Sequence, residues 1–466
     1  MSSTPGFPSS RPSVSFWLQH TRNSPLLGHR TTQNLPVKSD VTIVGSGLSG
    51  VATAYFLLTA EPEDRRPSSV TLFEAREACD GATARNGGHC RPDCYRDYKY
   101  YKDDFGREQA LKIIQNEMDT LNLTEEIIAK EGIDCDFWRG HTYDIPMDIA
   151  SAEHLAAAYA EFAADGGPVH GIITPILDPA QAREQTRCPA ATAAYKTPAG
   201  SLFPRKLVLH LLALCIEKHG LNFQSNTPVR RVVSTSDGWL VETDRGAVET
   251  QKVVYATNAF TATLLPEFIG HIWPFKGQCS AIVPPDAYAG KGMLRETYAL
   301  GNGEYLIQRP ADGIMIYGGQ RRSVPVERLL GNTDDESTIA EMTKALNDSL
   351  PRYLDGFDQE SLAEGEGMVH VWSGIMGYTT EGVPYVGELH DKPGAFICAG
   401  HHGHGMARIM TCARGLAQLI QGDSWEATGL PECFQPTQKR LARPAKAVVH
   451  NIGKQDIIGQ GQGWEA

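Results

Sequence analysis

The sequence lacks the features that mark several large classes of protein. Its ten cysteines include no CxxC pair, which disfavours a zinc site or a disulfide framework and fits a reducing, cytoplasmic setting. No apolar run approaches the ~20 residues of a membrane span, and the most apolar stretch, residues 207–216, is interrupted by His210. Basic residues are outnumbered, and the net charge of −12 disfavours nucleic acid or an anionic membrane as the main partner.

Acidic residues are absent from residues 1–39, which are rich in Ser, Pro and Thr and carry Arg and Lys. That composition is typical of an organelle transit peptide. The repeated prolines, however, discourage an amphipathic helix, and Phe16, Trp17, Leu26 and Leu27 are suited to packing on a folded body. We therefore expect a packed extension, with a transit peptide as the alternative.

The sequence does contain a glycine-rich turn between a strand pattern and a helix pattern. The β-branched run 41–44 enters a GxGxxG turn formed by Gly45, Gly47 and Gly50, and the apolar run 51–58 leaves it. Gly45 permits the sharp turn, Gly47 lets backbone N–H groups approach a pyrophosphate, and Gly50 allows close helix–strand packing. The helix N-terminus adds unpaired N–H donors and a positive dipole end. The turn predicts an adenine-dinucleotide site.

The next β-rich run, residues 70–74, ends in Glu74. A carboxylate at the tip of the second strand accepts hydrogen bonds from ribose hydroxyls, and it disfavours the 2′-phosphate of NADP. The interval after Gly50 is slightly longer than the usual ~20 residues, because the polar, proline-containing loop 61–69 intervenes. An ordinary βαβ unit is the alternative interpretation.

The rest of the chain alternates between helix and strand patterns. Residues 75–97 form a long loop dense in Gly, Cys, Arg and His, and such loops are usually functional. Helices are predicted at 107–129, 151–165 and 206–219, and a buried strand at 253–259 ends at a ligand-binding sheet edge or in a turn capped by Asn258. From 273 to 319 the period switches to two, which predicts an antiparallel sheet. An acidic helix at 333–350, strands at 368–372 and 395–400, and a helix to about 420 follow.

Together these segments resemble the D-amino-acid oxidase, glycine oxidase and sarcosine oxidase superfamily of FAD-dependent oxidoreductases over residues 40–422. The resemblance rests on the following segments: 41–50 with Glu74, the loop 81–89, the strand 253–259, residues 274–278, and residues 372–387 followed by the glycine cluster 400–405. The loop 85–89 and the N-terminal segments 15–17 and 29–32 resemble a fungal branch of this superfamily.

The resemblance implies an α/β fold (α+β overall) in which a Rossmann-like FAD-binding domain is interleaved with an antiparallel-sheet substrate domain. The discontinuous FAD-binding domain comprises residues 40–110, 200–272 and 366–433, and the substrate-binding domain comprises residues 111–199 and 273–365. Residues 1–39 are the N-terminal extension, and residues 434–466 are a C-terminal tail with little periodicity.

The resemblance also implies which residues hold FAD. They are Gly45, Ser46, Gly47, Leu48, Ser49 and Gly50 at the pyrophosphate; Glu74, Ala75 and Val229 at the adenosine; Arg85, Asn86, Gly87, Gly88 and His89 beside the isoalloxazine; Ala256, Thr257, Asn258 and Gly377; and Gly400, His401, His402, Gly403, His404, Gly405 and Met406 at the pyrimidine end. A helix N-terminus at that end stabilises the negative charge of reduced flavin.

Two other uses of such residues are a metal site and covalent attachment of the flavin. Three histidines within residues 401–404 seldom converge on one ion without a carboxylate nearby, so we expect no metal. Covalent attachment through Cys90, Cys94 or His89 is the alternative to the non-covalent FAD that we expect. In relatives of the sarcosine oxidase type the attaching cysteine lies in the segment here occupied by residues 373–378, which contains no cysteine.

The implied reaction is removal of hydride from a carbon next to nitrogen, which leaves an imine that water hydrolyses. No side chain need act as a general base. The candidates for facing the substrate are Arg91, Tyr305, Arg309, Tyr317, His370, Trp372 and Tyr378. Either arginine could bind a carboxylate bidentately, and a structural salt bridge is the alternative.

The sequence departs from the family at one position. Relatives of the sarcosine oxidase type place a lysine that assists the reaction with oxygen on the strand here occupied by residues 314–316, where Met315 is neutral. Lys276 is the nearest candidate for a replacement charge. We expect an oxidase of a small-molecule amine or amino acid that releases peroxide from molecular oxygen, as a monomer or homodimer.

Three alternatives stay open. The first is a dehydrogenase that passes electrons to another acceptor. The second is a flavin monooxygenase or an NAD(P)H-dependent reductase, although no second nicotinamide-binding glycine motif follows a later strand. The third is a tailoring flavoprotein that acts on a larger natural product.

Overall fold

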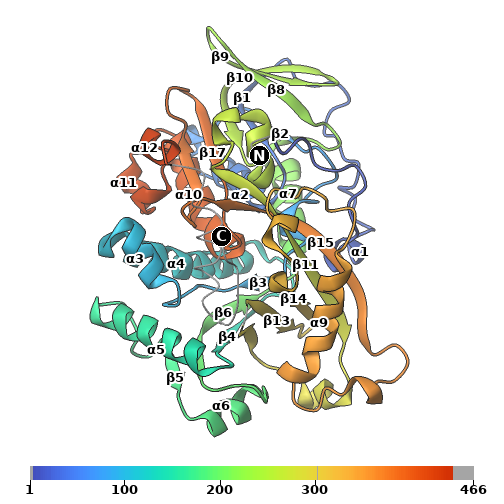
Figure 1. Ribbon diagram of the computed structural model, residues 1–466. Coiled ribbons are helices and arrows are strands. Elements are labelled where there is room, and N and C mark those ends of the chain that lie inside the picture. The colour runs from blue at the N-terminus through green and yellow to red at the C-terminus, as the bar shows by residue number, and fades with distance from the viewer. Residues whose placement is uncertain (1–3, 302, 444–466) are drawn as a thin grey trace.

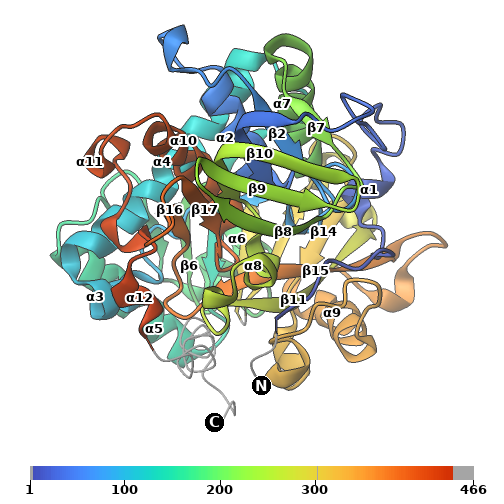
Figure 2. The same cartoon turned by 90° about the horizontal axis from the view of Figure 1, so that it is seen from above.

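Two β-sheets organise the chain in the computed structural model, which describes residues 4–301 and 303–443 (Figure 1). The first sheet has the order β16 (Tyr385–Glu388), β17 (Ala395–Ala399), β10 (Gly246–Tyr255), β1 (Lys38–Val44), β2 (Val70–Phe73), β7 (Asn222–Gln224). Its five strands from β17 to β7 are parallel. A hairpin of β8 (Val229–Thr235) and β9 (Gly238–Thr243) pairs with the first half of β10 (Figure 2).

The register of the central strands positions the site. Val44 is level with Tyr255 on one side and with Phe73 on the other, so β1, β10 and β2 end at the same edge of the sheet. Three helices pack together beside these strands: α2 (Leu48–Leu58), α7 (Pro204–His219) and α10 (Gly405–Ile420). All but one residue of α2 is buried, which explains why its sequence is apolar all round.

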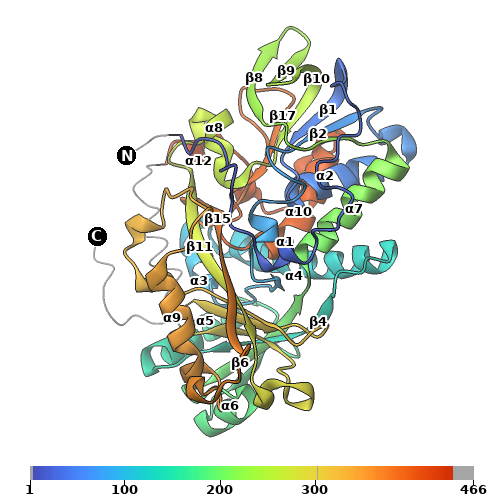
Figure 3. The same cartoon turned by 90° about the vertical axis from the view of Figure 1, so that its right-hand side faces the viewer.

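The second sheet has the order β15 (Gly367–Thr379), β11 (Ile272–Val283), β14 (Met315–Gly318), β13 (Glu304–Gln308), β12 (Thr297–Leu300), β4 (Trp138–Ile145), β6 (Ala194–Ser201), β3 (His89–Cys90), with β5 (Thr174–Ile176) paired to β6. Every pairing is antiparallel except that of β12 with β4. Helix α9 (Ala340–Tyr353) lies alongside this sheet (Figure 3) and packs its apolar side chains on Met315 and Tyr317.

The described residues form eight further α-helices. They are α1 (Phe16–Gln19), α3 (Tyr98–Phe105), α4 (Arg107–Glu131), α5 (Ile149–Ala164), α6 (Pro179–Thr186), α8 (Thr261–Leu264), α11 (Trp425–Thr428) and α12 (Gln438–Leu441). Within the described ranges, no helix combines the length and apolar character that crossing a bilayer requires.

The predicted fold class and the strand–turn–helix at residues 41–58 are confirmed. Two details differ. Strand β15 pairs with β11 in the second sheet and continues to Thr379, whereas residues 366–433 were predicted in the first domain. Helix α9 begins at Ala340 instead of Thr333, because the side chains of Asn332 and Asp334 accept hydrogen bonds from nearby backbone N–H groups.

Both chain ends pack on the body where they are described. The extension is packed, as predicted: Trp17 is fully buried, its ring centroid lies 4.8 Å from that of Phe203, and its Nε1–H donates to the Asn86 carbonyl at 2.7 Å. In the predicted tail Phe434 is buried and Arg440 pairs with Glu381 at 3.2 Å. Residues 444–466 of that tail lie outside the described residues.

The packing of the extension is testable with Trp17→Ala. Removing a fully buried indole leaves a cavity and an unpaired carbonyl, so we expect a loss of about 3–5 kcal/mol in the free energy of unfolding. Val37→Ala, at a position 75% exposed in the same extension, should change it by less than ~0.5 kcal/mol. Denaturant unfolding measures both, and equal stabilities for the two variants would contradict the packed extension.

Candidate functional site

A long cavity, here called the first cavity, follows the edge where β1, β2 and β10 end. Its walls come from the glycine turn, the ends of β2 and β10, the start of β8 and the loop before α10. The lining residues that argue for its role are Gly45, Gly47, Leu48, Ser49, Glu74, Ala75, Val229, Ala256, Thr257, Asn258, Gly377, His401, His402, Gly403, Gly405 and Met406.

The glycine turn that starts this cavity tolerates no side chain at two of its three glycines. A Cβ on Gly50 would lie 1.9 Å from the Gly45 carbonyl oxygen, and a Cβ on Gly45, where φ is +108°, would lie 2.6 Å from the Ala256 carbonyl oxygen. At Gly47 the nearest atom to an added Cβ is the Thr83 hydroxyl, at 3.4 Å. Gly45 and Gly50 therefore serve the fold, whereas Gly47 leaves room at the cavity wall.

Glu74 stands at the end of β2, as predicted, and its carboxylate is already engaged. Its Oε2 accepts from the Ser46 N–H at 3.0 Å and the Ser46 hydroxyl at 2.7 Å, and its Oε1 accepts from the Arg76 N–H at 2.9 Å. A carboxylate offers about four acceptor positions. The three donors hold Glu74 at the cavity wall and leave capacity for a ribose hydroxyl.

At the other end of the first cavity the loop 400–404 lies against residues 258 and 377. The Gly400 N–H donates to Asn258 Oδ1 at 3.0 Å, and a Cβ on Gly377 would lie 2.5 Å from the same oxygen. The His402 N–H donates to the Gly377 carbonyl at 2.9 Å. These contacts bring the N-terminus of α10, with its unpaired N–H groups and positive dipole end, to the cavity.

His401 supplies a polar group for a ligand in this cavity. Its Nε2 lies 3.2 Å from the Ser49 hydroxyl, while its buried Nδ1 has no hydrogen-bond partner among the described residues. Burial, with a smaller effect of Arg408, lowers the pKa of His401 to about 3, so the ring is neutral. A cavity with a glycine turn and an acceptor carboxylate at one end, and a helix N-terminus and an orphaned ring nitrogen at the other, fits FAD.

A second cavity adjoins the first and is bounded by β11, β13, β15 and the loop 85–97. The two share the lining residues Ala82, Asn86, Ile375, Met376, His402, Gly403 and Met406. The polar and aromatic residues of the second cavity are Arg85, His89, Arg91, Arg96, Asp97, Phe275, Gln278, Glu304, Tyr305, Arg321, Tyr378 and His404. These shared residues place the two cavities side by side.

Charged groups of both signs meet at one wall of the second cavity. Arg91 pairs with Asp144 at 2.8 Å, and Arg96 pairs with Asp93 at 2.7 Å. Asp97 is only 7% exposed, and burial, reinforced by the charge of Asp93, raises its pKa from 3.8 to about 7. This carboxyl group therefore changes its charge near neutral pH.

His404 borders the second cavity, and its ring contacts a buried ion pair. Its Nδ1 lies 3.3 Å from Glu117 Oε1, and Glu117 pairs with Arg408 at 2.7 Å. Burial alone would raise the pKa of Glu117, but Arg408 and His404 outweigh it and lower that pKa to about 2. Burial and Arg408 lower the pKa of His404, so a neutral ring donates from Nδ1 to the carboxylate.

The structure separates the predicted cofactor residues into three groups. Most of them line the first cavity, while Arg85, Gly87, His89 and His404 line the second. Four residues line none of these cavities and instead contact residues that do or the segments beside them: Ser46, Gly50, Gly88 and Gly400. Ser46 binds Glu74, and Gly88, at φ +80°, packs against the Trp17 ring.

Of the predicted substrate residues, three line the second cavity. Besides Arg91, these are Tyr305, whose hydroxyl lies 3.1 Å from Cys279 Sγ, and Tyr378, which accepts from Arg321 Nη1 at 3.0 Å. The ring of Tyr378 stacks on Phe275 with centroids 4.4 Å apart. These tyrosines give the cavity an aromatic wall with polar tips.

The structure places two predicted cations away from these cavities. Lys276 is buried and its Nζ pairs with Asp334 at 2.9 Å, because its neighbours Phe275 and Gly277 face the cavity and strand side chains alternate. Arg309 pairs with Asp136 at 3.1 Å and with Asp312, which makes it a structural salt bridge.

Three further candidates are also structural. Tyr317 lies under α9 and contacts the Ser349 hydroxyl at 2.7 Å. His370 contacts the Val14 carbonyl of the extension at 2.5 Å. Trp372 is fully buried, and its Nε1–H donates to the Arg85 carbonyl at 2.8 Å, so it positions the loop instead of the substrate.

Several lining residues had no signal in the sequence. Gly6, Phe7 and Pro8 of the extension line the first cavity, and Arg96, Asp97, Glu304 and Arg321 line the second. Arg96 and Asp97 lay at the end of the functional loop 75–97, and that position was the only hint. For a metal, the described part of the chain offers no cluster of three or more His, Cys, Asp or Glu side chains.

Comparisons with known proteins agree with this geometry. Residues 40–419 match a family model described as FAD dependent oxidoreductase. Gamma-glutamylputrescine oxidoreductase of Escherichia coli is 23% identical over 403 residues, which span 84% of this chain and 86% of that protein. Glycine oxidase of Geobacillus kaustophilus is 23% identical over 390 residues, 82% of this chain and 93% of that one.

Solved structures share the fold. The crystal structure of glycine oxidase from Geobacillus kaustophilus superposes with a TM-score of 0.69 at 22% identity, covering 86% of this chain and 99% of the other. L-proline dehydrogenase from P. horikoshii superposes with a TM-score of 0.67 at 18% identity, covering 86% and 98%.

The difference between the glycines is testable through cofactor content. Gly47→Ala fits the turn but adds a methyl group at the cavity wall, so we expect a folded protein that binds FAD at least ~10-fold more weakly. Gly50→Ala should instead lose the fold. Thermal unfolding and flavin absorbance measure the two effects, and wild-type FAD content in Gly47→Ala would contradict this assignment.

The buried carboxyl group predicts a pH dependence of stability. Because the folded pKa of Asp97 is raised, its ionisation opposes folding, and stability falls as the pH rises from about 4 to about 7. Asp97→Asn should remove this loss and gain about 2–4 kcal/mol over wild type at pH 8 relative to pH 4. The control Asp103→Asn, exposed on the helix α3 that follows Asp97, should keep the wild-type profile. Parallel profiles for all three proteins would contradict the raised pKa.

Proposed function

The chain belongs to the FAD-dependent oxidoreductase family, and from that premise we propose that it oxidises the C–N bond of a small amine or amino acid. The observation that carries the proposal is that the two cavities share lining residues, among them Met376 and Gly403. The first cavity fits FAD, and the second brings charged and aromatic side chains to the place where the first cavity ends.

The first cavity would hold FAD along the sheet edge. The glycine turn and the N-terminus of α2 would bind the pyrophosphate, with Glu74 at the ribose. When bound, FAD supplies the electron sink and accepts a hydride at its N5 position. The N-terminus of α10 would place N–H donors where reduced flavin carries negative charge, which favours the reduced state.

The second cavity would select and orient the substrate. Tyr305 and Tyr378 form an aromatic wall that excludes water, and Arg91 and Asp97 present opposite charges in the same space. A group that accepts a proton near neutral pH suits a substrate whose nitrogen must lose its proton before oxidation. Two relatives support this class by name, one acting on gamma-glutamylputrescine and one on glycine.

We propose oxygen as the electron acceptor and a dehydrogenase as the second candidate. Strand β14 carries Met315 in the segment where relatives of the sarcosine oxidase type carry the lysine that assists oxygen. Met315 lies in the apolar core beneath α9. Lys276 does not replace that lysine, since it faces Asp334. The missing lysine is the observation that favours a dehydrogenase as the second candidate, and an assay for peroxide distinguishes the two.

We also propose that FAD is bound without a covalent bond. The thiolate is the reactive form of cysteine, and burial raises the pKa of Cys90 to about 12 and that of Cys94 still further. His89 borders the second cavity, where burial and Arg91 lower its pKa to about 3 and its Nε2 lies 3.3 Å from the Leu306 carbonyl. The fungal origin, the cytoplasmic setting and the oligomeric state stay predictions.

A panel of amines and amino acids tests the function on the purified holoprotein. We expect anaerobic bleaching of the flavin by at least one member, followed in air by peroxide together with an aldehyde or keto product. Bleaching without peroxide, but with turnover in the presence of an artificial acceptor, would identify the dehydrogenase. Bleaching by NADPH, or silence with every amine, would overturn the proposal in favour of a reductase or a tailoring flavoprotein.

A further inference from the structure

The N-terminal extension takes part in both cavities. Residues 4–15, here called the strap, precede residue 40, where the family match begins. Gly6, Phe7 and Pro8 line the first cavity, and the Ser13 carbonyl accepts from Arg85, which lines the second. The strap is therefore a wall of the site that this chain adds outside the matched region.

Phe7 lies at one particular end of the first cavity. The guanidinium of Arg230 lies 4.7 Å from the centre of its ring, and Arg230 follows Val229, which lines the cavity at the start of β8. The neighbouring Gly6 carbonyl accepts a hydrogen bond from the Thr263 hydroxyl, and Thr263 also lines the cavity. Phe7 thus stands on the side of β8, where the adenosine of a bound dinucleotide would lie, and it remains 40% exposed.

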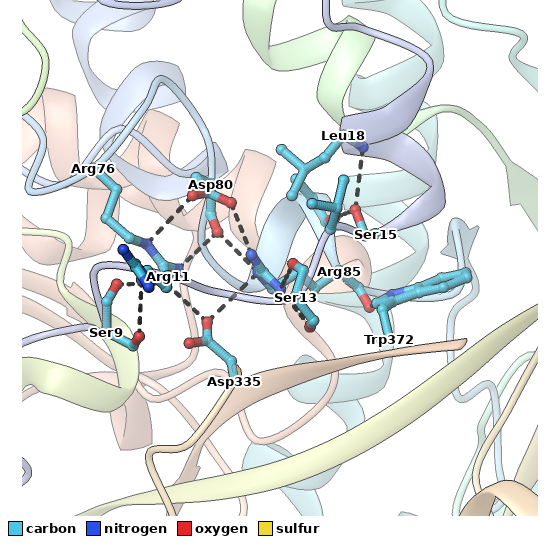
Figure 4. A network of polar contacts seen from close by, with 12 residues as sticks. Ser9, Arg11, Ser13, Ser15, Leu18, Arg76, Asp80, Arg85, Asp335 and Trp372 are labelled. Carbon is cyan, nitrogen blue, oxygen red and sulfur yellow. Dashed lines mark hydrogen bonds and ion pairs between the residues drawn. The ribbon is translucent and has the colours of Figure 1, made fainter. Parts of the chain in front are cut away.

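A buried ionic cluster fastens the strap (Figure 4). Asp335 Oδ2 lies 2.9 Å from Arg76 Nη1 and 3.6 Å from Arg85 Nε, and Asp80 lies 2.9 Å from Arg85 Nη2. The same two arginines donate to the strap backbone, Arg76 to the Ser9 carbonyl at 3.3 Å and Arg85 to the Ser13 carbonyl at 2.7 Å.

The segment before α9 closes the cluster from the other side. The Ser13 N–H donates to the Asp335 carbonyl at 2.6 Å, and the Ser9 hydroxyl donates to the Glu336 carboxylate. The strap is thus held between the loop 75–97, which supplies the arginines, and the segment 334–337, whose Asp334 pairs with Lys276 of β11.

We propose that the strap is part of the FAD site: Phe7 covers the adenosine end of the cofactor, and the ionic cluster around Asp335 keeps the strap in place. This inference rests on the FAD site of the proposed function. It assigns to the extension a share in FAD retention and in the preference for FAD over FMN, which has no adenosine to cover.

The physical basis is the cost of unfastening the strap. Asp335 is 1% exposed and lies between two buried guanidinium groups, so its removal leaves two cations in low dielectric with one carboxylate, Asp80. Moving the arginines to water would then release the backbone carbonyls of Ser9 and Ser13. Loss of an aromatic contact to a base commonly weakens binding about tenfold.

The first experiment compares Phe7→Ala with Val37→Ala, an exposed apolar position of the same extension that lines none of these cavities. Flavin-depleted full-length protein is titrated with FAD and with FMN, and binding is followed by flavin fluorescence. We expect Phe7→Ala to bind FAD about tenfold more weakly than Val37→Ala, with equal affinities for FMN. Equal losses for both flavins, or no loss for either, would overturn the role of Phe7.

The second experiment tests the ionic cluster on the holoprotein. Asp335→Asn is compared with Glu341→Gln, which breaks an exposed ion pair with Arg328 outside the ionic cluster. After dilution, the rise of free flavin fluorescence should be at least about tenfold faster for Asp335→Asn. If Asp335→Asn fails to fold, Ser9→Pro tests the fastening of the strap instead, because it removes the exposed hydrogen bond from the Ser9 hydroxyl to Glu336. If folded Asp335→Asn or folded Ser9→Pro released FAD at the same rate as Glu341→Gln, the proposal would be overturned.

Amine oxidation is measured on the same preparations. A wild-type protein that retains FAD through Phe7 but oxidises no amine would end the proposed function and leave the strap standing. Amine oxidation with an FAD release rate that no strap variant changes would do the opposite.

Discussion

The structure depends on a close approach of two backbone segments at the glycine turn. A Cβ on Gly50 would lie 1.9 Å from the Gly45 carbonyl oxygen, and a Cβ on Gly45 would lie 2.6 Å from the Ala256 carbonyl oxygen. Only glycine lets β1 end level with β2 and β10 and turn at once into α2. Glu74 and the N-terminus of α2 then reach the same edge, and the first cavity follows from that edge.

Buried ion pairs extend this arrangement to the second sheet. Glu117 on α4 holds both Arg408 and His404 at the start of α10, and Asp144 on β4 holds Arg91 at the second cavity. A charge removed from water needs a partner of the opposite sign, so each of these groups constrains the position of another. The first set joins α4 to α10, and the second joins the loop 75–97 to β4 of the second sheet.

The first cavity was largely predictable from the sequence because its determinants are local. A turn that needs glycine, a strand that ends in Glu74 and a glycine cluster before a helix each leave a short pattern. The second cavity has no such pattern, because its residues come from separate strands and meet only through pairing. Arg96 and Tyr305 are far apart in sequence, and no spacing rule relates them.

Strand parity explains which substrate candidates failed. On β11, Phe275, Gly277 and Cys279 alternate along the face that lines the second cavity. The side chains of Lys276 and Gln278 point to the other side, where they bond Asp334 and Thr343, although Gln278 also borders the cavity. A shift of one residue in the pairing of β11 would have exchanged these faces. Composition and charge do not encode that choice; the register of β11 with β14 and β15 does. A lysine on a strand that borders the site is therefore no evidence that its ammonium group faces the flavin. The chemistry with oxygen has to be judged from the side chains that β11 presents to the cavity.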